Sequence, residues 1–440
     1  MAMVDPAYRA LMRGVSLAGL ALALSGCMGG WTPGAGVTKS AQSPGQEALA
    51  SRPERKVEGS AVIADLAGRR SILPAGSSYD HIARAVLAAD AGSAQAELRV
   101  KRLTAEARSK NWLPSLGPSV SLTSLSSVAT SLLLNQTLFD FGRRKAEREY
   151  AVADVEVAAV TLSVDANRRV FQALSLYVDA EAARARTAVA LDALSRLSDF
   201  DRIMALRVQG GVANMSEQTV LRQKLNEMQA TLQADRDAEL LAASELDQMA
   251  QAPVSGSAGL TELPGAMPGV TPLAVRLAEA EKERTIAELK VNRADYLPGL
   301  GASSNLGKGG IGVSGDIDNG LGLGSKAALE AVNAGADAAV ARVAQSGQDA
   351  ARKKQALELK IANLDRQSAA QADVARQMRD NLRRFEQQYK AGVRPLMDLV
   401  TQHESLAAME RDLVNMRHER ARARLEIARD LGLLADGAGI

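Results

Sequence analysis

The stretch from Arg143 to Gln209 contains neither proline nor glycine, and it constrains the fold more than any other part of the chain. It is about 67 residues long, which corresponds to roughly 100 Å of helix at about 1.5 Å per residue. Helices in globular proteins average about 11–12 residues. A helix this long needs partners along its whole length, because propensity alone does not hold a helix in water. The sequence therefore predicts a mainly α-helical protein built around long helices packed side by side.

The second half of the chain repeats the turn and helix-boundary motifs of the first half. Three short motifs recur at offsets of 184, 182 and 181 residues: Asn111–Pro114 as Asp295–Pro298, Phe139–Gly142 as Leu321–Gly324, and Gln209–Val212 as Lys390–Val393. A period of about 180 residues indicates one duplicated unit and not a solenoid of short repeats. The counterpart of the first long helix is Lys326–Ala391, whose only glycines are Gly335 and Gly347.

The composition narrows the classes of function. The net charge is +2 and no block of lysine and arginine stands out, which weighs against a nucleic-acid partner. Aromatic residues make up 3% of the chain, so alanine-rich helix contacts are expected in place of a large compact core. The single cysteine excludes an intrachain disulfide. After the N-terminus, no apolar run reaches the roughly 20 residues of a membrane-spanning helix.

The N-terminus has the pattern of a secretory signal. Arg9 and Arg13 precede an apolar stretch, Val15–Leu24, and the segment ends in Leu24–Cys27. This ending resembles a bacterial lipobox, in which the thiol of the cysteine, here Cys27, receives diacylglycerol and becomes the first mature residue. Met28 in place of aspartate favours sorting to the outer membrane. The alternative is a plain signal peptide with an incidental cysteine.

Two regions between the helices have strand character. Ser119–Thr123 alternates polar and apolar residues, and Ser131–Phe139 is apolar, with a turn expected over Ser124–Thr130. The second such region, 299–323, is rich in glycine. Runs of about 10 residues fit strands that cross a bilayer in a tilted barrel, and a soluble hairpin is the alternative. Interfacial aromatic residues at the hairpin bases favour the membrane: Trp112, Phe139, Phe141 and Tyr296.

Two hairpins supply only four strands, whereas a closed barrel needs about eight. Three chains would supply twelve strands, so the membrane interpretation predicts a homotrimer.

A single helix is expected over Asp80–Asn111. The predicted divisions are a lipoprotein signal peptide (1–26), a lipidated and largely irregular extension (27–78), repeat 1 (79–251, with hairpin 115–140, long helix 143–209 and return helix 214–251), a proline-rich linker (252–272), repeat 2 (273–433, with hairpin 299–323, long helix 326–391 and return helix 395–433) and a tail (434–440).

From Asp80 to Leu433 the chain resembles the TolC family of outer-membrane efflux and secretion channels. The most specific segments are Asn135–Arg144, which looks like the strand-to-helix junction of that family, and Tyr389–Val400, which looks like its periplasmic helical tip. The resemblance implies a trimeric, 12-stranded transmembrane β-barrel continued by a long α-helical coiled-coil barrel in the periplasm. It implies an outer-membrane location and two partners: a periplasmic adaptor (membrane fusion) protein and an inner-membrane pump of the ABC, RND or MFS type.

The resemblance also assigns roles to individual residues. Tyr389 and Arg394 match the tip residues that hold the channel closed, and Glu217 and Ser216 match their partners on the neighbouring hairpin. Asp398 matches an aspartate that rings the narrow entrance, although the second such aspartate is Thr401 here. The turns that contact the adaptor match five residues: Gly210, Gly211, Val212, Gly392 and Val393.

No residue set supports an enzyme. The G-x-G-x-x-G match at Gly310–Gly315 follows no strand and opens no helix, so it does not indicate a nucleotide site. His81, His403 and His418 lack metal-ligand spacing and are expected on the surface, and no cofactor or metal is predicted. A periplasmic adaptor would carry one helical hairpin between β-rich halves, whereas this chain has two predicted hairpins and little predicted strand. The remaining alternative is a non-conducting structural coiled-coil lipoprotein of the outer membrane.

Overall fold

The long helix is present as α5 (Arg143–Gln209), which is 67 residues long and uninterrupted. It coincides with the stretch that lacks glycine and proline, and Gly142 and Gly210 flank it. The computed structural model describes residues 60–90, 92–124, 127–256, 259–264, 269–305, 310–316 and 325–439. Val57–Ile440 form one compact unit, to which the following description refers. The predicted signal peptide and the lipidation site Cys27 lie outside the described residues.

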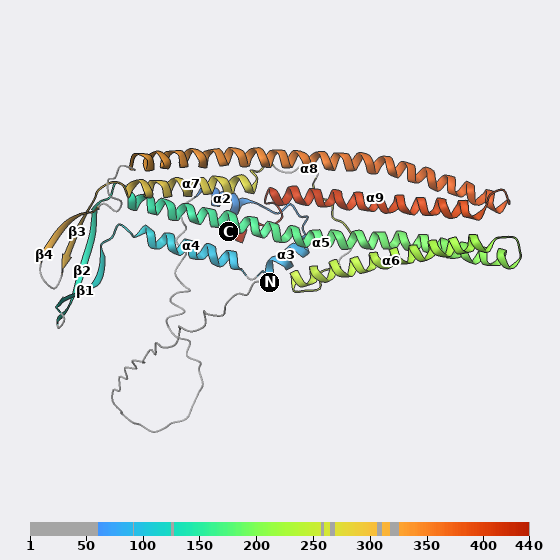
Figure 1. Cartoon of the computed structure of the whole chain (residues 1–440), viewed down its shortest axis with the longest axis horizontal. Helices are drawn as coiled ribbons and strands as arrows, with labels where there is room; N and C mark the ends of the chain where they lie inside the picture. The colour runs from blue at the N-terminus through green and yellow to red at the C-terminus, as the bar shows by residue number, and fades with distance from the viewer. Residues whose placement is uncertain are drawn as a thin grey trace, which may run out of the picture. The chain divides into compact units, whose positions relative to one another are not determined.

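Four long helices form two hairpins (Figure 1). The first hairpin joins α5 to α6 (Met215–Ala250), and the second joins α8 (Ser325–Lys390) to α9 (Leu396–Asp430). Helix α8 continues through both of its glycines. A β-carbon on Gly335 would lie 3.2 Å from Cδ1 of Leu289 in α7 (Leu273–Ala294), so the missing side chain lets the two helices approach closely.

Residues 80–111 form two helices, and the prediction of a single helix there was wrong. The structure has α3 (Ser78–Ala88) and α4 (Ser93–Ser109), separated at Gly92, whose φ is +67°. A left-handed residue cannot continue a right-handed helix, and glycine adopts this conformation without steric cost. The predicted irregular extension is helical in one described part, because Ser60 caps the short helix α2 (Ala61–Gly68) and Leu66 is buried.

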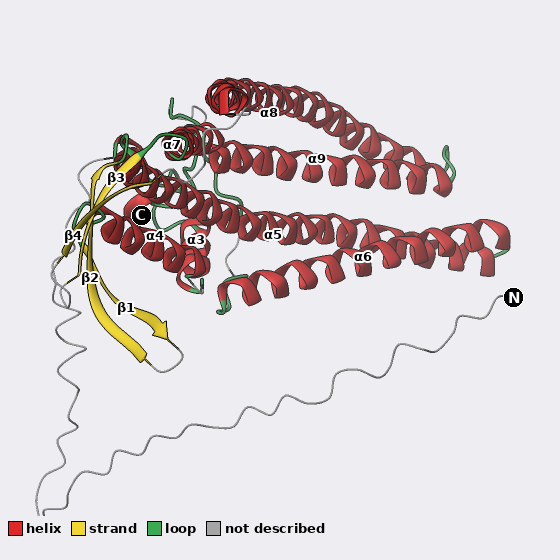
Figure 2. Cartoon of the chain, turned by 60° about the vertical axis from the view of Figure 1, so that its left-hand side comes forward, coloured by secondary structure: helices red, strands yellow, loops and turns green. Residues whose placement is uncertain are grey.

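The strands form one antiparallel sheet in the order β1-β2-β3-β4 (Figure 2). They are β1 (Ser115–Ser124), β2 (Ser127–Phe139), β3 (Gly299–Asn305) and β4 (Gly310–Asp316). The first turn is tighter than predicted, because Ser124 already pairs with Ser127. In the second hairpin, residues 317–323 lie outside the described part of the chain.

The register gives the sheet two chemically different faces. Residues directly opposite each other in an antiparallel pair share a face. The pairs Leu116↔Leu134 and Pro118↔Leu132 therefore lie on one face, and Leu134↔Ser304↔Ile311 extends that face across all four strands. Apart from Leu133, which is an apolar exception, the other face carries mainly small and polar residues: Ser115, Gly117, Asn135, Thr137, Gly301, Ser303 and Gly312. Gln136 and Ser304 are the polar exceptions on the apolar face.

Apolar side chains are buried in separate clusters along α5. The largest cluster packs α3, α5, α6 and α9 together, with Tyr79 and Tyr177 edge to face at a centroid distance of 5.9 Å. The buried face of α5 is rich in alanine, which lets its neighbours approach closely: Ala153, Ala159, Ala173, Ala180, Ala183 and Ala190. This arrangement agrees with the low aromatic content, because no single core spans the unit.

The two ends of the unit are bonded to each other. The backbone N–H of Ile72 donates to the carbonyl of Leu433 at 2.9 Å, and that of Gly437 donates to the carbonyl of Arg69 at 3.0 Å. The buried guanidinium of Arg69 donates to the carbonyl of Leu431 at 2.7 Å. The segment before α3 is thereby fixed to the segment after α9.

Candidate functional site

Both hairpin tips have the same backbone geometry. At the first tip, Val212 N–H donates to Arg207 O (2.9 Å) and Gly211 N–H donates to Val208 O (3.0 Å). The second tip repeats the pattern, with bonds from Val393 to Gln388 and from Gly392 to Tyr389, both 2.9 Å. This pair of hydrogen bonds is the Schellman motif, which requires a residue in the left-handed conformation. Gly211 and Gly392 supply it, with φ of +72° and +75°.

Replacing Gly392 with alanine is expected to destabilise the folded protein by about 1–2 kcal/mol, because a β-carbon in the left-handed region meets the following carbonyl oxygen. Gly347 is the matched control: it lies inside α8, its φ is not positive, and a β-carbon there would meet nothing within 4 Å. Gly347→Ala is expected to stabilise by up to about 1 kcal/mol. Urea unfolding curves of the two variants measure the difference, and shifts of the same sign would contradict it.

The turn residues expose apolar side chains. Val212 is 69% exposed and Val393 is 76% exposed, and Leu206 and Met215 beside the first turn are also exposed. Exposed apolar residues that gather at one place often mark a surface that contacts another protein. The three turn glycines carry no side chain, so a partner could approach the backbone closely.

The structure brings Arg394 and Asp398 together within the second hairpin. Nη1 of Arg394 lies 3.1 Å from Oδ2 of Asp398, one turn further along the chain in α9. Nε of Arg394 donates to Oε1 of Gln388 at 2.8 Å, and the guanidinium stacks 3.7 Å from the ring centroid of Phe385. Asp398 also lies in the first turn of α9, where the helix dipole favours a negative charge.

Tyr389 has a partner that the sequence did not indicate. Nη1 of Arg207, in α5, donates to the Tyr389 hydroxyl at 3.5 Å, and its guanidinium lies 5.9 Å from the Tyr389 ring centroid. Ser216 and Glu217 lie in the first turn of α6, which the side chain of Asn214 caps. Within the described residues, neither of them bonds to Tyr389 or Arg394, so their predicted pairing across neighbouring hairpins stays a prediction.

An apolar cluster joins the two hairpins beneath the tips, through Met204 of α5, Leu221 of α6 and Leu399 of α9. His403 packs here against the ring of Phe200 at a centroid distance of 5.2 Å, with Nε2 3.6 Å from Oε1 of Glu386. Burial lowers the pKa of His403, although Glu386 acts in the opposite direction.

The surface location expected for all three histidines was wrong for two of them. His403 is half-buried in the tip cluster, and His418 is buried in α9 with Nδ1 2.7 Å from the carbonyl of Val414. Burial lowers the pKa of His418 as well. His81 is exposed. Within the described residues no group of His, Cys, Asp and Glu could hold a metal ion.

A charged cluster links the hairpins farther from the tips. Oδ1 of Asp235, in α6, accepts a hydrogen bond from Nε of Arg186 in α5 at 2.8 Å, and its Oδ2 accepts one from Arg411 in α9. Asp235 is only 5% exposed. Burial raises the pKa of Asp235, but the bonds to Arg411 and Arg186 outweigh burial and hold the pKa below its usual value. The carboxylate is therefore ionised at neutral pH.

The predicted interfacial aromatic residues lie at the sheet end of the unit. Trp112, Phe139 and Phe141 are exposed and Tyr296 is half-buried, and the rings of Phe139 and Phe141 meet edge to face at 4.6 Å. Phe141 has a φ of +49°, which is rare for a residue with a side chain. Its neighbour Asp140 holds this junction, since its carboxylate accepts the N–H groups of Gly142 and Arg144 at the start of α5.

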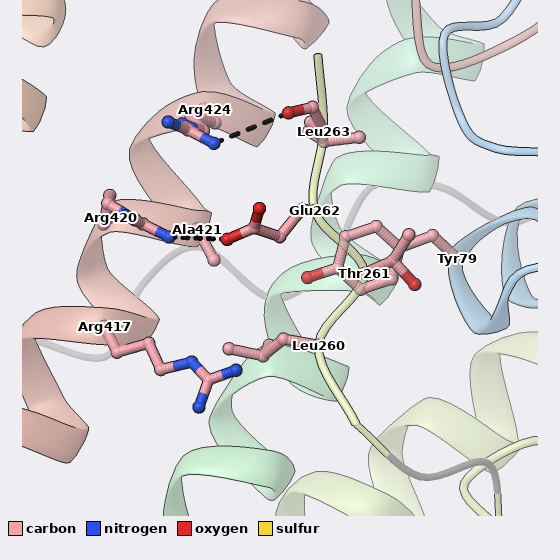
Figure 3. A pocket seen from close by; sticks show the side chains of 9 residues that line it. All are labelled: Tyr79, Leu260, Thr261, Glu262, Leu263, Arg417, Arg420, Ala421 and Arg424. Carbon is pink, nitrogen blue, oxygen red and sulfur yellow. Dashed lines mark hydrogen bonds and ion pairs between the residues drawn. The ribbon is translucent and has the colours of Figure 1, made fainter. Parts of the chain in front are cut away.

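A small pocket lies between α9 and the linker segment 260–263 (Figure 3). Its arginines hold the linker in place: Arg420 pairs with Glu262 at 2.9 Å and with Asp365 of α8 at 2.8 Å, and Arg424 donates to the carbonyl of Leu263. These bonds fix the linker against α8 and α9, which gives the pocket a structural role.

No family model matches the sequence, and no curated protein matches it. Several solved structures do match. The outer membrane protein VceC of Vibrio cholerae aligns with a TM-score of 0.70 and 16% identity over 80% of this chain and 96% of that chain. The outer-membrane channel OprN aligns with a TM-score of 0.71 and 18% identity over 86% and 97% of the two chains. The open state of the MtrE outer membrane channel of Neisseria gonorrhoeae aligns at 0.66 and 17% identity, over 82% and 90%.

At these identities the comparison establishes the fold. The chain has the fold of the outer-membrane channels of the TolC type, as its sequence predicted. In the described part of the chain, no helix has the length and apolar character of a membrane span.

Proposed function

We propose that this protein is an outer-membrane channel, the outermost part of a tripartite efflux or type I secretion system. In this role it receives substrate from an inner-membrane pump and a periplasmic adaptor and passes it across the outer membrane. The observation that carries the proposal is the sheet with one mainly apolar and one mainly polar face. On the apolar face, Ile311 is 83% exposed and Val313 is 70% exposed.

Among the described residues Ile311 and Val313 are largely uncovered, which favours contact with lipid, and strands of transmembrane barrels alternate apolar-out and polar-in. In the described residues, β1 and β4 each pair on one side only, so both edges are available for pairing with another chain. Edge-to-edge pairing of three sheets closes a barrel of twelve strands. The proposed channel is therefore a homotrimer, and each chain contains two copies of one repeated unit.

The gate of the proposed channel lies at the hairpin tips. Three copies of Asp398 around one axis would attract cations and repel anions, as charged rings do in pores. Tyr389, Arg394, Ser216 and Glu217 are the proposed closing residues, and the two exposed turns are the proposed adaptor contacts. The predicted signal and lipid at Cys27 would anchor the chain in the outer membrane, which is the proposed location.

Conductance across a planar bilayer tests the proposal. Full-length protein extracted from outer membranes is expected to migrate as a trimer and to give small, cation-selective current steps. The rival is a structural lipoprotein that associates with the membrane through its lipid only. That rival predicts a trimer that never conducts, even when the closing residues Tyr389 and Arg394 are replaced.

A further inference from the structure

The proposed gate residues at the tip do little to tie the two hairpins of one chain together. Arg394 and Asp398 belong to the same hairpin, so their ion pair survives any movement of one hairpin against the other. Among the described residues, Tyr389 has one hydrogen bond to the first hairpin, at 3.5 Å from Arg207, whose guanidinium also lies 5.9 Å from the Tyr389 ring centroid. Among the described tip residues, polar contacts between the two hairpins are therefore few.

The cluster around Asp235 has the properties of such a contact. Its carboxylate belongs to the first hairpin and binds Arg411 of the second, with the side chain of Arg411 only 20% exposed. Two more bonds cross at the same level: Nη1 of Arg186 donates to Oδ1 of Asn415 at 3.1 Å, and Nη1 of Arg411 donates to the backbone carbonyl of Arg186 at 3.5 Å. The bonds that Arg411 and Asn415 make to Asp235 and Arg186 must break if α9 leaves α5 and α6, whereas the pair of Arg186 with Asp235 lies within the first hairpin.

Burial distinguishes this cluster from the other ion pairs between the hairpins. The side chain of Asp235 is 7% exposed, whereas Glu404 in the pair with Lys224 is 24% exposed and Asp179 in the pair with Arg422 is 51% exposed. An exposed pair exchanges its partner for water at little cost, whereas a buried charge that loses its partner stays poorly solvated. Movement of α9 would leave this buried carboxylate with Arg186 alone, so the movement is opposed more than at the exposed pairs.

We propose that Asp235, Arg186 and Arg411 form a second closing contact of the channel, separate from the tip, which must release Arg411 when the second hairpin swings away from the first. This inference rests on the proposed channel function. It makes Asp235 a positioning residue for the gate: it does not line the constriction but sets how readily α9, which carries Asp398, can move.

Single-channel recordings of full-length trimers test the contact. Asp235→Asn preserves the size of the side chain and removes its charge, and the fraction of time spent open is expected to rise at least about tenfold. Asp179→Asn is the matched control, because it neutralises an exposed pair between α5 and α9, and its effect is expected to stay below about twofold. Arg411→Gln removes only the bond from α9 and leaves Arg186 bonded to Asp235, so it is also expected to raise the open fraction. This second variant tests the contact if Asp235→Asn fails to assemble.

The Tyr389→Phe, Arg394→Ser variant, recorded in parallel, separates the two ways of failing. Suppose that the tip variant conducts more than the unmodified protein, while Asp235→Asn and Arg411→Gln open no more often than the unmodified protein. The proposed second closing contact is then wrong, and the channel proposal stands. If Asp179→Asn opens as often as Asp235→Asn, general loosening explains both and the assignment to Asp235 is wrong. If none of these trimers ever conducts, the channel proposal itself is wrong.

Discussion

Replacing Ile311 and Val313 with arginine is expected to abolish channel formation. Both residues are highly exposed on the apolar face of β4, and in a barrel wall that face meets lipid. An arginine on the lipid side costs about 2–4 kcal/mol near the bilayer midplane. With two substitutions in each of three chains, insertion becomes unfavourable. Loss of all current steps after reconstitution, at equal protein yield, measures the effect.

The opposite face of the same sheet provides the control. Ser303→Arg combined with Thr137→Arg adds the same two charges on the mainly polar face. Ser303 of β3 pairs with Gly312, which lies between Ile311 and Val313 in β4. If that face lines an aqueous lumen, this variant still inserts and conducts, with reduced preference for cations. Equal loss of current in both double variants would show that the sheet tolerates no added charge and would remove the argument for a lipid-facing side.

The second large effect is expected at the tip. Tyr389→Phe removes the hydroxyl that accepts from Arg207, and Arg394→Ser removes the pair with Asp398 and the stacking on Phe385. The bond from Arg207 crosses between the hairpins, and Arg394 is the residue that the resemblance matches to a closing contact with the neighbouring hairpin. Each contact is lost three times in a trimer. Single-channel conductance is therefore expected to rise severalfold over that of the unmodified protein.

Lys390→Ser is a control for this change, because it removes a charge from the end of α8 next to Tyr389 but no hydrogen bond of Lys390 takes part in the contacts above. It is expected to leave conductance unchanged within about twofold. An unchanged conductance in the Tyr389→Phe, Arg394→Ser variant, with trimers of normal size, would show that these two residues do not hold the gate.

The parts of the fold that the sequence predicted depend on local chemistry. The bounds of α5 follow from the flanking glycines, and both tips follow from a glycine that must be left-handed. The break between α3 and α4 depends on the same chemistry, but Gly92 stands in an alanine-rich stretch whose composition favours helix, so it was missed. The tight first turn was missed because serine-rich residues carry no strong strand or turn signal.

The contacts of the candidate site that the sequence did not indicate join residues that are far apart in the chain. Asp235 meets Arg186 across 49 residues and Arg411 across 176 residues, so no local pattern marks them as partners. Arg207 reaches Tyr389 across 182 residues for the same reason. His403 and His418 are isolated in sequence, and only the packing of α9 against its neighbours shows that they are buried.

The bonds between the two ends of the unit have a consequence for how the chain folds. Arg69 and Leu431 are 362 residues apart, and Gly437 sits where a β-carbon would lie 1.9 Å from the carbonyl oxygen of Leu66. Contacts of such high sequence separation form late, because the entropy of closing the loop is lost before they contribute. The helical hairpins can form as the chain emerges, but the unit closes only after its last ten or so residues arrive.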